Sequence, residues 1–313
     1  MVIRGADWFV SASIWIARKV SVPEVLVGAT LVSLGTTLPE LSISAYSSYR
    51  GFGAVAYGNA VGSCIANIGL IMGGTVALKS LPIKDTLFFR NAILMIGATA
   101  VLVVFSANGS LERWNGVALL AMMLAYYLYL ARLTKLSSAE PWPDEHTEPP
   151  KGRLSRSLDS VLGKSLQFVA GAAAIAVGSR FIVTSATSLA EILGIPERAI
   201  ALTLIALGTS LPELATALTA LSKGHQALSA GNIMGANFLN ITAVLGVAST
   251  IGPVPTGQKA MSIDYPFMLI LMVGLLVFAT TSRRLSRYEG VALLSIYLLY
   301  IVIVFLTGPG PGL

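Results

Sequence analysis

The chain contains an internal repeat within strongly apolar sequence, and this combination leaves few folds open. Residues 5–40 align without a gap onto residues 178–213, at an offset of 173 positions. The same offset relates further small and polar residues, which are Gly58, Asn59, Gly62 and Asn67 in the first copy and Gly231, Asn232, Gly235 and Asn240 in the second. With a shift of one more residue, RWNGVALL at 113–120 matches RYEGVALL at 287–294. The chain therefore consists of two copies of one unit.

The composition places both copies in a membrane. Hydrophobic residues make up 55% of the 313 positions and charged residues only 12%, against about a quarter in a soluble domain. Glycine, proline and charge clusters divide the chain into ten apolar segments, most of which approach the ~20 residues that span a bilayer as a helix. We therefore expect an all-α, polytopic membrane protein with about ten transmembrane helices, near residues 5–17, 24–48, 55–78, 88–106, 114–131, 164–189, 197–222, 228–250, 264–281 and 288–306.

Each copy holds five of these segments, and an odd number makes the second copy enter the membrane from the opposite side. We expect a first five-helix repeat over 1–136, a polar cytoplasmic linker loop over 137–163, and a second, inverted repeat over 164–313. Inverted repeats are typical of secondary transporters, which bind their substrate near the midplane between the two halves.

Basic residues indicate the orientation. Fifteen of the 21 Lys and Arg residues fall in the linker and in the connections on its side of the membrane, and five fall on the other side. Because cytoplasmic loops are rich in Lys and Arg, we expect the linker in the cytoplasm and both termini outside, in a protein of the plasma membrane. The net charge of +6 is then a topology signal of a chain in a lipid bilayer, and it predicts no nucleic-acid partner.

The first apolar segment is short. Residues 1–17 are barely enough to cross a bilayer, whereas the sixth segment has an apolar lead-in over 165–178 before the repeat begins. We expect the native start to lie upstream of Met1; a short, peripheral first helix is the alternative.

Two carboxylates occupy equivalent places in the apolar segments, where acidic residues are otherwise nearly absent. They are Glu40, in GTTLPE, and Glu213, in GTSLPE. A carboxylate at membrane depth costs at least ~2.5 kcal/mol on insertion scales and indicates a functional site. A structural ion pair is the alternative, but apart from Arg180 neither repeat has a basic residue at that depth to form one.

Each motif also supplies neutral oxygens. The proline before each glutamate removes a helix hydrogen bond and frees the carbonyl of the glycine four residues earlier. Freed carbonyls at membrane depth persist only inside protein or beside a cavity. A threonine four residues before each glutamate shares its helix face, and these pairs are Thr36 with Glu40 and Thr209 with Glu213.

A stripe of polar residues follows in the next span of each copy. It consists of Asn59, Ser63 and Asn67 in the first copy and of Asn232, Ala236 and Asn240 in the second. The glycines of these spans form small-xxx-small pairs that let helices pack closely. The asparagines either hydrogen-bond between helices or line a site, and the sequence leaves both open.

The predicted ligands are all oxygen atoms. Cys64 is the single cysteine, which excludes an internal disulfide and a multi-cysteine metal site, and His146 and His225 lie in polar connections. Transition metals prefer the missing nitrogen and sulfur ligands. Mg²⁺ keeps its waters, whereas Ca²⁺ takes six to eight oxygens in flexible geometry. Two carboxylates balance the charge of Ca²⁺, so the pattern favours this ion.

The paired GT[TS]LPE and GN-x-x-G-x-x-x-x-N motifs resemble the α-repeats of the sodium/calcium exchanger family, over nearly the whole chain. The resemblance implies ten transmembrane helices, a central Ca²⁺ site, flanking Na⁺ sites and alternating access. It makes Glu40 and Glu213 ligands shared by Ca²⁺ and Na⁺, together with the backbone at Thr36 and Thr209. The flanking Na⁺ sites or their surroundings would include Thr37, Ser210, Ser63 and the carbonyls of Ser33 and Ala206, and the middle of the site would be lined by Asn67 and Asn240.

Two positions depart from the family's pattern. Ala236 lacks the hydroxyl that many relatives have, so one Na⁺ site is expected to be weaker or built differently. Asn240 stands where the potassium-dependent branch carries Asp, which argues against K⁺ coupling and leaves two site carboxylates. The linker is also too short for the regulatory Ca²⁺-binding domains of larger relatives.

The sequence thus predicts a secondary active antiporter that exchanges Ca²⁺ for Na⁺ by alternating access, with these ions as partners and no cofactor. A Ca²⁺/H⁺ antiporter on the same scaffold is the nearest alternative, and a cation channel is a more distant one. No HExxH motif, nucleophile-and-base pair or nucleotide loop points to an enzyme. The oligomeric partner stays open.

Overall fold

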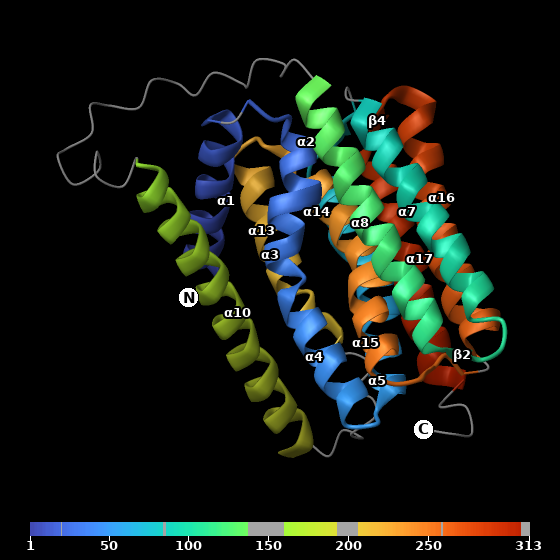
Figure 1. Ribbon diagram of the computed structural model, residues 1–313. Coiled ribbons are helices and arrows are strands. Elements are labelled where there is room, and N and C mark those ends of the chain that lie inside the picture. Colours follow the sequence, from blue (N-terminus) through green and yellow to red (C-terminus); the bar gives the residue numbers. More distant parts are fainter. Residues whose placement is uncertain (20, 84–85, 137–159, 193–205, 258, 308–313) are drawn as a thin grey trace.

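Helices occupy all ten predicted positions in the computed structural model, which describes residues 1–19, 21–83, 86–136, 160–192, 206–257 and 259–307 (Figure 1). The bounds differ from the predicted ones by a few residues. The first nine positions of the seventh segment, 197–205, and the linker up to residue 159 lie outside the described residues.

The first repeat contains α1 (Val2–Lys19), α2 (Glu24–Val27), η1 (Gly28–Val32), α3 (Ser33–Thr36), α4 (Leu38–Tyr49), α5 (Gly53–Ala66), η2 (Asn67–Met72), α6 (Gly73–Leu78), α7 (Thr86–Phe105) and α8 (Arg113–Leu136). The second contains α10 (Val161–Ile192), α12 (Ala206–Thr209), α13 (Leu211–Ser222), α14 (Gln226–Leu239), η4 (Asn240–Val244), α15 (Leu245–Ile251), η5 (Ala260–Asp264), α16 (Tyr265–Ser282) and α17 (Arg287–Thr307). The symbol η marks π-helical turns. Short strands are β1 (Leu81–Pro82), β2 (Ser110–Leu111), β3 (Val254–Pro255) and β4 (Arg284–Leu285).

The helices form a membrane-spanning bundle with two enclosed central spans. Among the described residues, seven helices are long and apolar enough to cross a membrane, and α2–α4, bent by 46° where α3 ends, add an eighth. In the most apolar stretch of each span, 89% of the residues of the continuous span α14–α15 are buried, whereas only 17% of those of α17 are buried. Spans α5–α6 and α14–α15 therefore form the centre, and α8, α10 and α17 face the lipid.

The strand pairs show that the two repeats are inverted. Strand β1 pairs antiparallel with β4, and β2 pairs antiparallel with β3. In the repeat alignment β3 is the copy of β1, and β4 is the copy of β2. The two pairs thus exchange under the repeat, and they lie at opposite ends of the bundle (Figure 1). The connections at the β1–β4 end contain more Lys and Arg residues than those at the β2–β3 end.

Helix α1 packs antiparallel on the first half of α10 through small residues. A Cβ placed on Gly5 would lie 2.9 Å from the Gly171 carbonyl oxygen, and one on Gly178 would lie 2.7 Å from Val2. Phe9 contacts Phe168, with ring centroids 4.5 Å apart. The N-terminus lies beside the middle of α10 (Figure 1). The apolar residues 165–178 precede the repeat and have no equivalent in the first segment. They form the part of α10 that α1 covers.

The core spans of the two repeats meet without side chains between them. A Cβ on Gly28 of η1 would overlap the Leu228 carbonyl oxygen of α14, and a Cβ on Gly231 of α14 would overlap the Val25 carbonyl oxygen of α2. Such close approach is what small-xxx-small pairs allow. The packing interpretation of these glycines is therefore confirmed for Gly231 and for Gly235, whose Cβ would lie 2.6 Å from the Ala29 carbonyl oxygen. It is wrong for Gly58, where a Cβ would meet no described atom within 4 Å.

We predict that Gly231→Ala destabilises the protein, because the new methyl group meets backbone rather than a movable side chain. Overpacking of this kind costs ~1–3 kcal/mol. The midpoint of thermal unfolding in detergent should fall for Gly231→Ala and stay unchanged for Gly97→Ala, whose Cβ would meet no described atom within 4 Å. Equal midpoints for the two variants would contradict the close backbone contact.

Candidate cation site

Two broken helices position the glutamates. Helix α3 ends at Thr36 and α4 starts at Leu38, and at the equivalent place in the second repeat α12 ends at Thr209 and α13 starts at Leu211. Two residues that lie 173 positions apart occupy equivalent places in the two repeats and are counterparts. Pro39 lies at the beginning of α4, where a missing N–H costs no helix bond. The loss of a helix hydrogen bond expected from the proline thus coincides with a bend of 46° at Thr37, whose backbone still bonds to Ser33 and to Leu41.

Glu40 and Glu213 lie in the first turns of α4 and α13. Each carboxylate lies near its own backbone N–H, and the two are close enough to repel one another. The positive end of the helix dipole partly offsets the free-energy cost of this repulsion. Both side chains are almost fully buried, at 1% and 0% exposed. Arg180, the basic residue considered from the sequence, is exposed on α10 and forms no ion pair with them in the described structure.

The carboxylates are accompanied by buried polar atoms without hydrogen-bond partners in the described structure. Such atoms are rare in proteins, and a group of them indicates a missing ligand. They include Glu40 Oε2, Glu213 Oε1 and Oε2, Thr37 Oγ1, Asn67 Oδ1, and Asn240 Oδ1 and Nδ2. No group of three or more His, Cys, Asp or Glu lies together in the described residues. A cation here would depend on two carboxylates and neutral oxygens.

One flank of the glutamate pair is a hydroxyl cluster between α5 and the α12–α13 break. Ser210 donates a hydrogen bond to Ser63 Oγ at 3.2 Å, and Ser63 Oγ lies 3.5 Å from Thr209 Oγ1. The cluster joins the first repeat to the second, as expected for a site between the halves. All three hydroxyls were predicted from the sequence.

The other flank has a different composition. The Thr36 hydroxyl lies 3.3 Å from both the Ser33 carbonyl oxygen and Asn232 Oδ1, and it lies beside Glu213. The side-chain hydroxyl of Thr37, the counterpart of Ser210, has no hydrogen-bond partner in the described residues. Ala236, the counterpart of Ser63, cannot provide one. The predicted departure at position 236 thus leaves an unpartnered hydroxyl in the structure.

An asparagine that sequence reasoning missed lies in the middle of the site. Asn67 Nδ2 donates to Asn237 Oδ1 at 2.9 Å, and Asn237 Nδ2 donates to the Cys64 carbonyl at 3.2 Å. Asn237 is fully buried. It fixes the side chain of Asn67 in an orientation that leaves Asn67 Oδ1 without a hydrogen-bond partner in the described structure. The sequence did contain a sign of Asn237, because GNIMGANFLN has a third asparagine. This residue does not fall on the polar stripe, whose members recur every four positions.

Two π-helical turns, η2 and η4, begin at Asn67 and at its counterpart Asn240. Such turns widen a helix and are frequent at functional sites. Every predicted site residue whose side chain is described is at most 5% exposed, namely Ser33, Thr36, Thr37, Glu40, Ser63, Asn67, Thr209, Ser210, Glu213 and Asn240. For Ala206 only the backbone, at the start of α12, is described.

Asp264 is an acidic residue at the start of an apolar span that the sequence analysis passed over. Its carboxylate accepts hydrogen bonds from Tyr300 at 3.0 Å and from Tyr57 at 3.4 Å. Both carboxylate oxygens are thus occupied, unlike those of Glu213. We interpret Asp264, the last residue of η5, as a structural contact of η5 with α5 and α17, not as part of the site.

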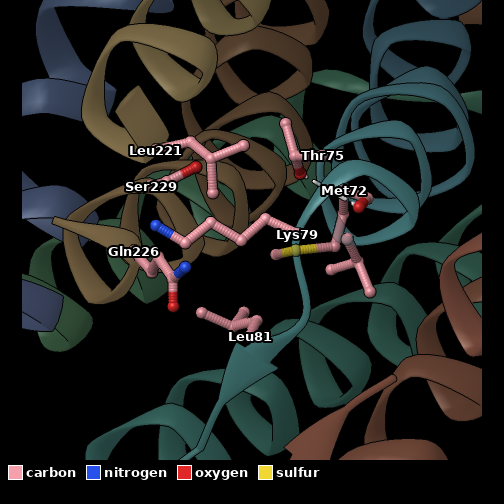
Figure 2. A pocket seen from close by; sticks show the side chains of 8 residues that line it. Met72, Thr75, Lys79, Leu81, Leu221, Gln226 and Ser229 are labelled. Atoms are coloured by element: carbon pink, nitrogen blue, oxygen red, sulfur yellow. Dashed lines mark hydrogen bonds between the residues drawn. The ribbon is translucent and has the colours of Figure 1, made fainter. Parts of the chain in front are cut away.

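A separate cleft lies between the ends of α6, α13 and α14, where the Lys79 side chain reaches toward Gln226 and Ser229 (Figure 2). An ammonium group disfavours a bound cation, so this cleft is not the candidate site. The equivalent surfaces at the opposite end of the bundle are in contact with one another. There Ser48, the counterpart of Leu221, donates a hydrogen bond to the Ala248 carbonyl at 2.6 Å.

We predict that Glu213→Gln abolishes high-affinity Ca²⁺ binding, since removing one partner of a buried charge pair costs about 3–5 kcal/mol, or more than 100-fold in affinity. In a chelator the same variant should be more stable than the wild type, because the repulsion between two buried carboxylates is relieved. Thermal unfolding of purified protein with Ca²⁺ and with chelator measures both effects. Glu112→Gln, on the exposed β2–α8 connection, should change neither.

Three comparisons identify relatives of the chain. The family model described as sodium/calcium exchanger protein matches residues 1–132 and 164–306. The sodium/calcium exchanger MaX1 of Methanosarcina acetivorans is 29% identical, with 97% of this chain and 95% of the relative covered, and the inner membrane protein YrbG of Escherichia coli is 32% identical, with 99% and 95% covered. A solved structure of the sodium-calcium exchanger NCX_Mj superimposes with a TM-score of 0.81 at 30% identity, over 97% of this chain and 95% of that one. The chain is an integral membrane protein that belongs to the sodium/calcium exchanger family, a family of transporters rather than enzymes.

Proposed function

We propose that the protein is a secondary active antiporter that exchanges Ca²⁺ for Na⁺ across the membrane. One observation carries the proposal. Two buried carboxylates lie at equivalent helix breaks with neutral oxygens around them and no basic partner in the described residues. Such a set suits a dehydrated hard cation. Relatives that bear the name sodium/calcium exchanger at about 30% identity support the choice of ions.

Coupling follows from the shared carboxylates. Glu40 and Glu213 would bind either one Ca²⁺, with the backbone at Thr36 and Thr209, or Na⁺ ions distributed to the two flanks. Both sets cannot be bound together, because each needs the same carboxylate oxygens. An empty site keeps two uncompensated buried charges, which opposes the conformational switch and keeps the exchange coupled.

Helices α1 and α10 would move against the core to switch access. Their mutual contact is close, with Gly5 against Gly171 and the ring centroids of Phe9 and Phe168 4.5 Å apart, so the two helices would move as a pair. Polar ties hold α1 to the end of α13, where Lys223 lies 2.8 Å from Asp7 and 3.0 Å from Ser11. These contacts would break and re-form as α1 moves.

The orientation is part of the proposal. We place the protein in the plasma membrane, with both termini outside and the linker 137–163 in the cytoplasm between the repeats 1–136 and 164–313. The number of Lys and Arg residues on the linker side supports it, as does the pairing of β1 with β4 at that end.

The nearest rival is Ca²⁺/H⁺ exchange, in which protons replace Na⁺ on the two glutamates. The unpartnered hydroxyl and amide oxygens favour Na⁺, because a bound proton needs no such ligands. A channel is disfavoured because the described glutamates are sealed from solvent.

We predict that proteoliposomes loaded with Na⁺ take up Ca²⁺ when diluted into Na⁺-free medium, and that uptake generates a membrane potential. The measurement is radioactive Ca²⁺ uptake with a voltage-sensitive dye, and empty liposomes and Glu213→Gln proteoliposomes are the controls. Uptake driven by a proton gradient alone would reject Na⁺ coupling in favour of the rival. Ca²⁺ currents without a counter-ion would indicate a channel.

We also predict that exchange does not depend on K⁺. Asn240 carries no charge to balance an additional cation, and both of its polar side-chain atoms are free in the described structure. Replacing K⁺ by choline on both sides of the vesicle should leave the Ca²⁺ uptake rate unchanged. A Ca²⁺ uptake rate that falls without K⁺ would contradict this prediction. It would show that the two site carboxylates are sufficient for K⁺ coupling.

A further inference from the structure

Two counterparts of the repeats contact one another between α5 and α14. Asn237 Nδ2 donates to the Cys64 carbonyl at 3.2 Å, and the Cys64 thiol donates to the Asn237 carbonyl at 3.6 Å. Because residues 64 and 237 are 173 positions apart, this reciprocal contact lies where the two repeats face one another. Cys64 is also close enough to Glu40 for the two groups to interact electrostatically. The contact therefore lies near the candidate site, between the halves.

The orientation of two amides follows from this contact. A backbone carbonyl can only accept a hydrogen bond, so Asn237 must direct Nδ2 to Cys64 and Oδ1 away from it. Asn237 Oδ1 can likewise only accept, and Asn67 directs its Nδ2 to it at 2.9 Å. Asn67 Oδ1 then faces away from Asn237 as a buried oxygen without a partner in the described residues. A backbone carbonyl, which cannot change its role, thus decides which atom Asn67 presents.

Asn67 shares a helix face with the hydroxyl cluster at the second helix break. It lies one turn after Ser63, whose hydroxyl contacts Thr209 and Ser210. Asn67 is fully buried, and the π-helical turn η2 begins at it. Its oxygen can accept a cation as a neighbour, whereas an amide –NH₂ group in the same place would repel one.

The second repeat lacks this control of its central amide. Asn240 is the counterpart of Asn67, and the residue that would orient it is the counterpart of Asn237, which is Cys64. A cysteine has no amide oxygen to accept a hydrogen bond from Asn240. Both polar side-chain atoms of Asn240 lack partners in the described structure. The two central amides therefore differ, because Asn67 is held in one orientation and Asn240 is not.

We propose that Asn237 is a positioning residue that strengthens Ca²⁺ binding by holding the Asn67 side chain with its oxygen toward the cation. The inference rests on the proposed function and deepens it. Without Asn237 the Asn67 amide can turn, and the buried carboxylates attract its –NH₂ group while the site is empty. Ca²⁺ then binds only the fraction of molecules that have the oxygen in place, and the apparent affinity falls by that fraction.

A purely structural role for Asn237 is the alternative, since its Nδ2 also satisfies the buried Cys64 carbonyl. The two roles differ in how they depend on Asn67. A structural residue has the same effect whether or not Asn67 is present, whereas a positioning residue changes Ca²⁺ affinity only while there is an amide to hold. A double-mutant cycle separates the two roles.

The cycle compares Ca²⁺ dissociation constants, measured by isothermal titration calorimetry on purified protein in detergent. Asn67→Ala and Asn237→Ala should each raise the dissociation constant about threefold to tenfold, the range expected for one lost polar contact. In the Asn67→Ala background, Asn237→Ala should cause no further change. In the Asn240→Ala background it should have its full effect, because Asn237 does not hold that amide.

Asn91→Ala is the control for loss of a buried amide elsewhere, since Asn91 accepts a hydrogen bond from Tyr126 in the α7–α8 contact. It should lower the midpoint of thermal unfolding without changing the dissociation constant for Ca²⁺. Asn237→Leu keeps the approximate shape of the side chain and removes both of its hydrogen bonds. It takes the place of Asn237→Ala in the cycle if that variant does not fold.

An Asn237→Ala effect of equal size with and without Asn67 would overturn the inference, and so would an unchanged dissociation constant in the single variant. Coupled effects in a protein that binds Ca²⁺ but does not exchange it for Na⁺ would defeat the proposed function alone, because the cycle uses binding only. Additive effects in a protein that does exchange the two ions would defeat the inference alone.

Discussion

The structure is organised around two buried carboxylates that repel one another and that no basic side chain of the described residues neutralises. Glu40 and Glu213 are enclosed by both repeats, and their remaining stabilisation comes from the helix N-termini on which they lie. Removing the cation leaves a site that the rest of the fold must tolerate. The π-helical turns at Asn67 and Asn240, the broken helices and the close backbone contacts all serve to bring polar atoms to one place in an apolar bundle.

Backbone proximity makes this arrangement possible. The first repeat supplies η1 and α3 to one side of α14, and Gly28 and Gly231 permit the helices to touch through main chain atoms. Because no bulky side chain separates them, hydroxyls on one helix reach the ligand sphere of the next.

Much of this arrangement could be predicted from the sequence because the repeat displays it twice. The ten helices, the breaks beside Pro39 and Pro212 and the burial of the two glutamates follow from motifs that recur at one offset. What could not be predicted depends on contacts between repeats. Asn237 interacts with Asn67 from the other half, and Asp264 is satisfied by tyrosines of two other helices, so no local pattern distinguishes them from ligands.

The cleft at Lys79 and the closed contact at Ser48 have a consequence for energetics. Two identical inverted repeats would make the inward-open and outward-open forms symmetry equivalents of equal free energy. Any preference between them must therefore come from counterparts that differ, such as Lys79 and Gly252 or Leu221 and Ser48. A difference of only ~1.4 kcal/mol populates one form tenfold over the other. The preference between the two forms is thus set less by the candidate site residues, which are nearly the same in both halves, than by the counterparts outside the site that differ.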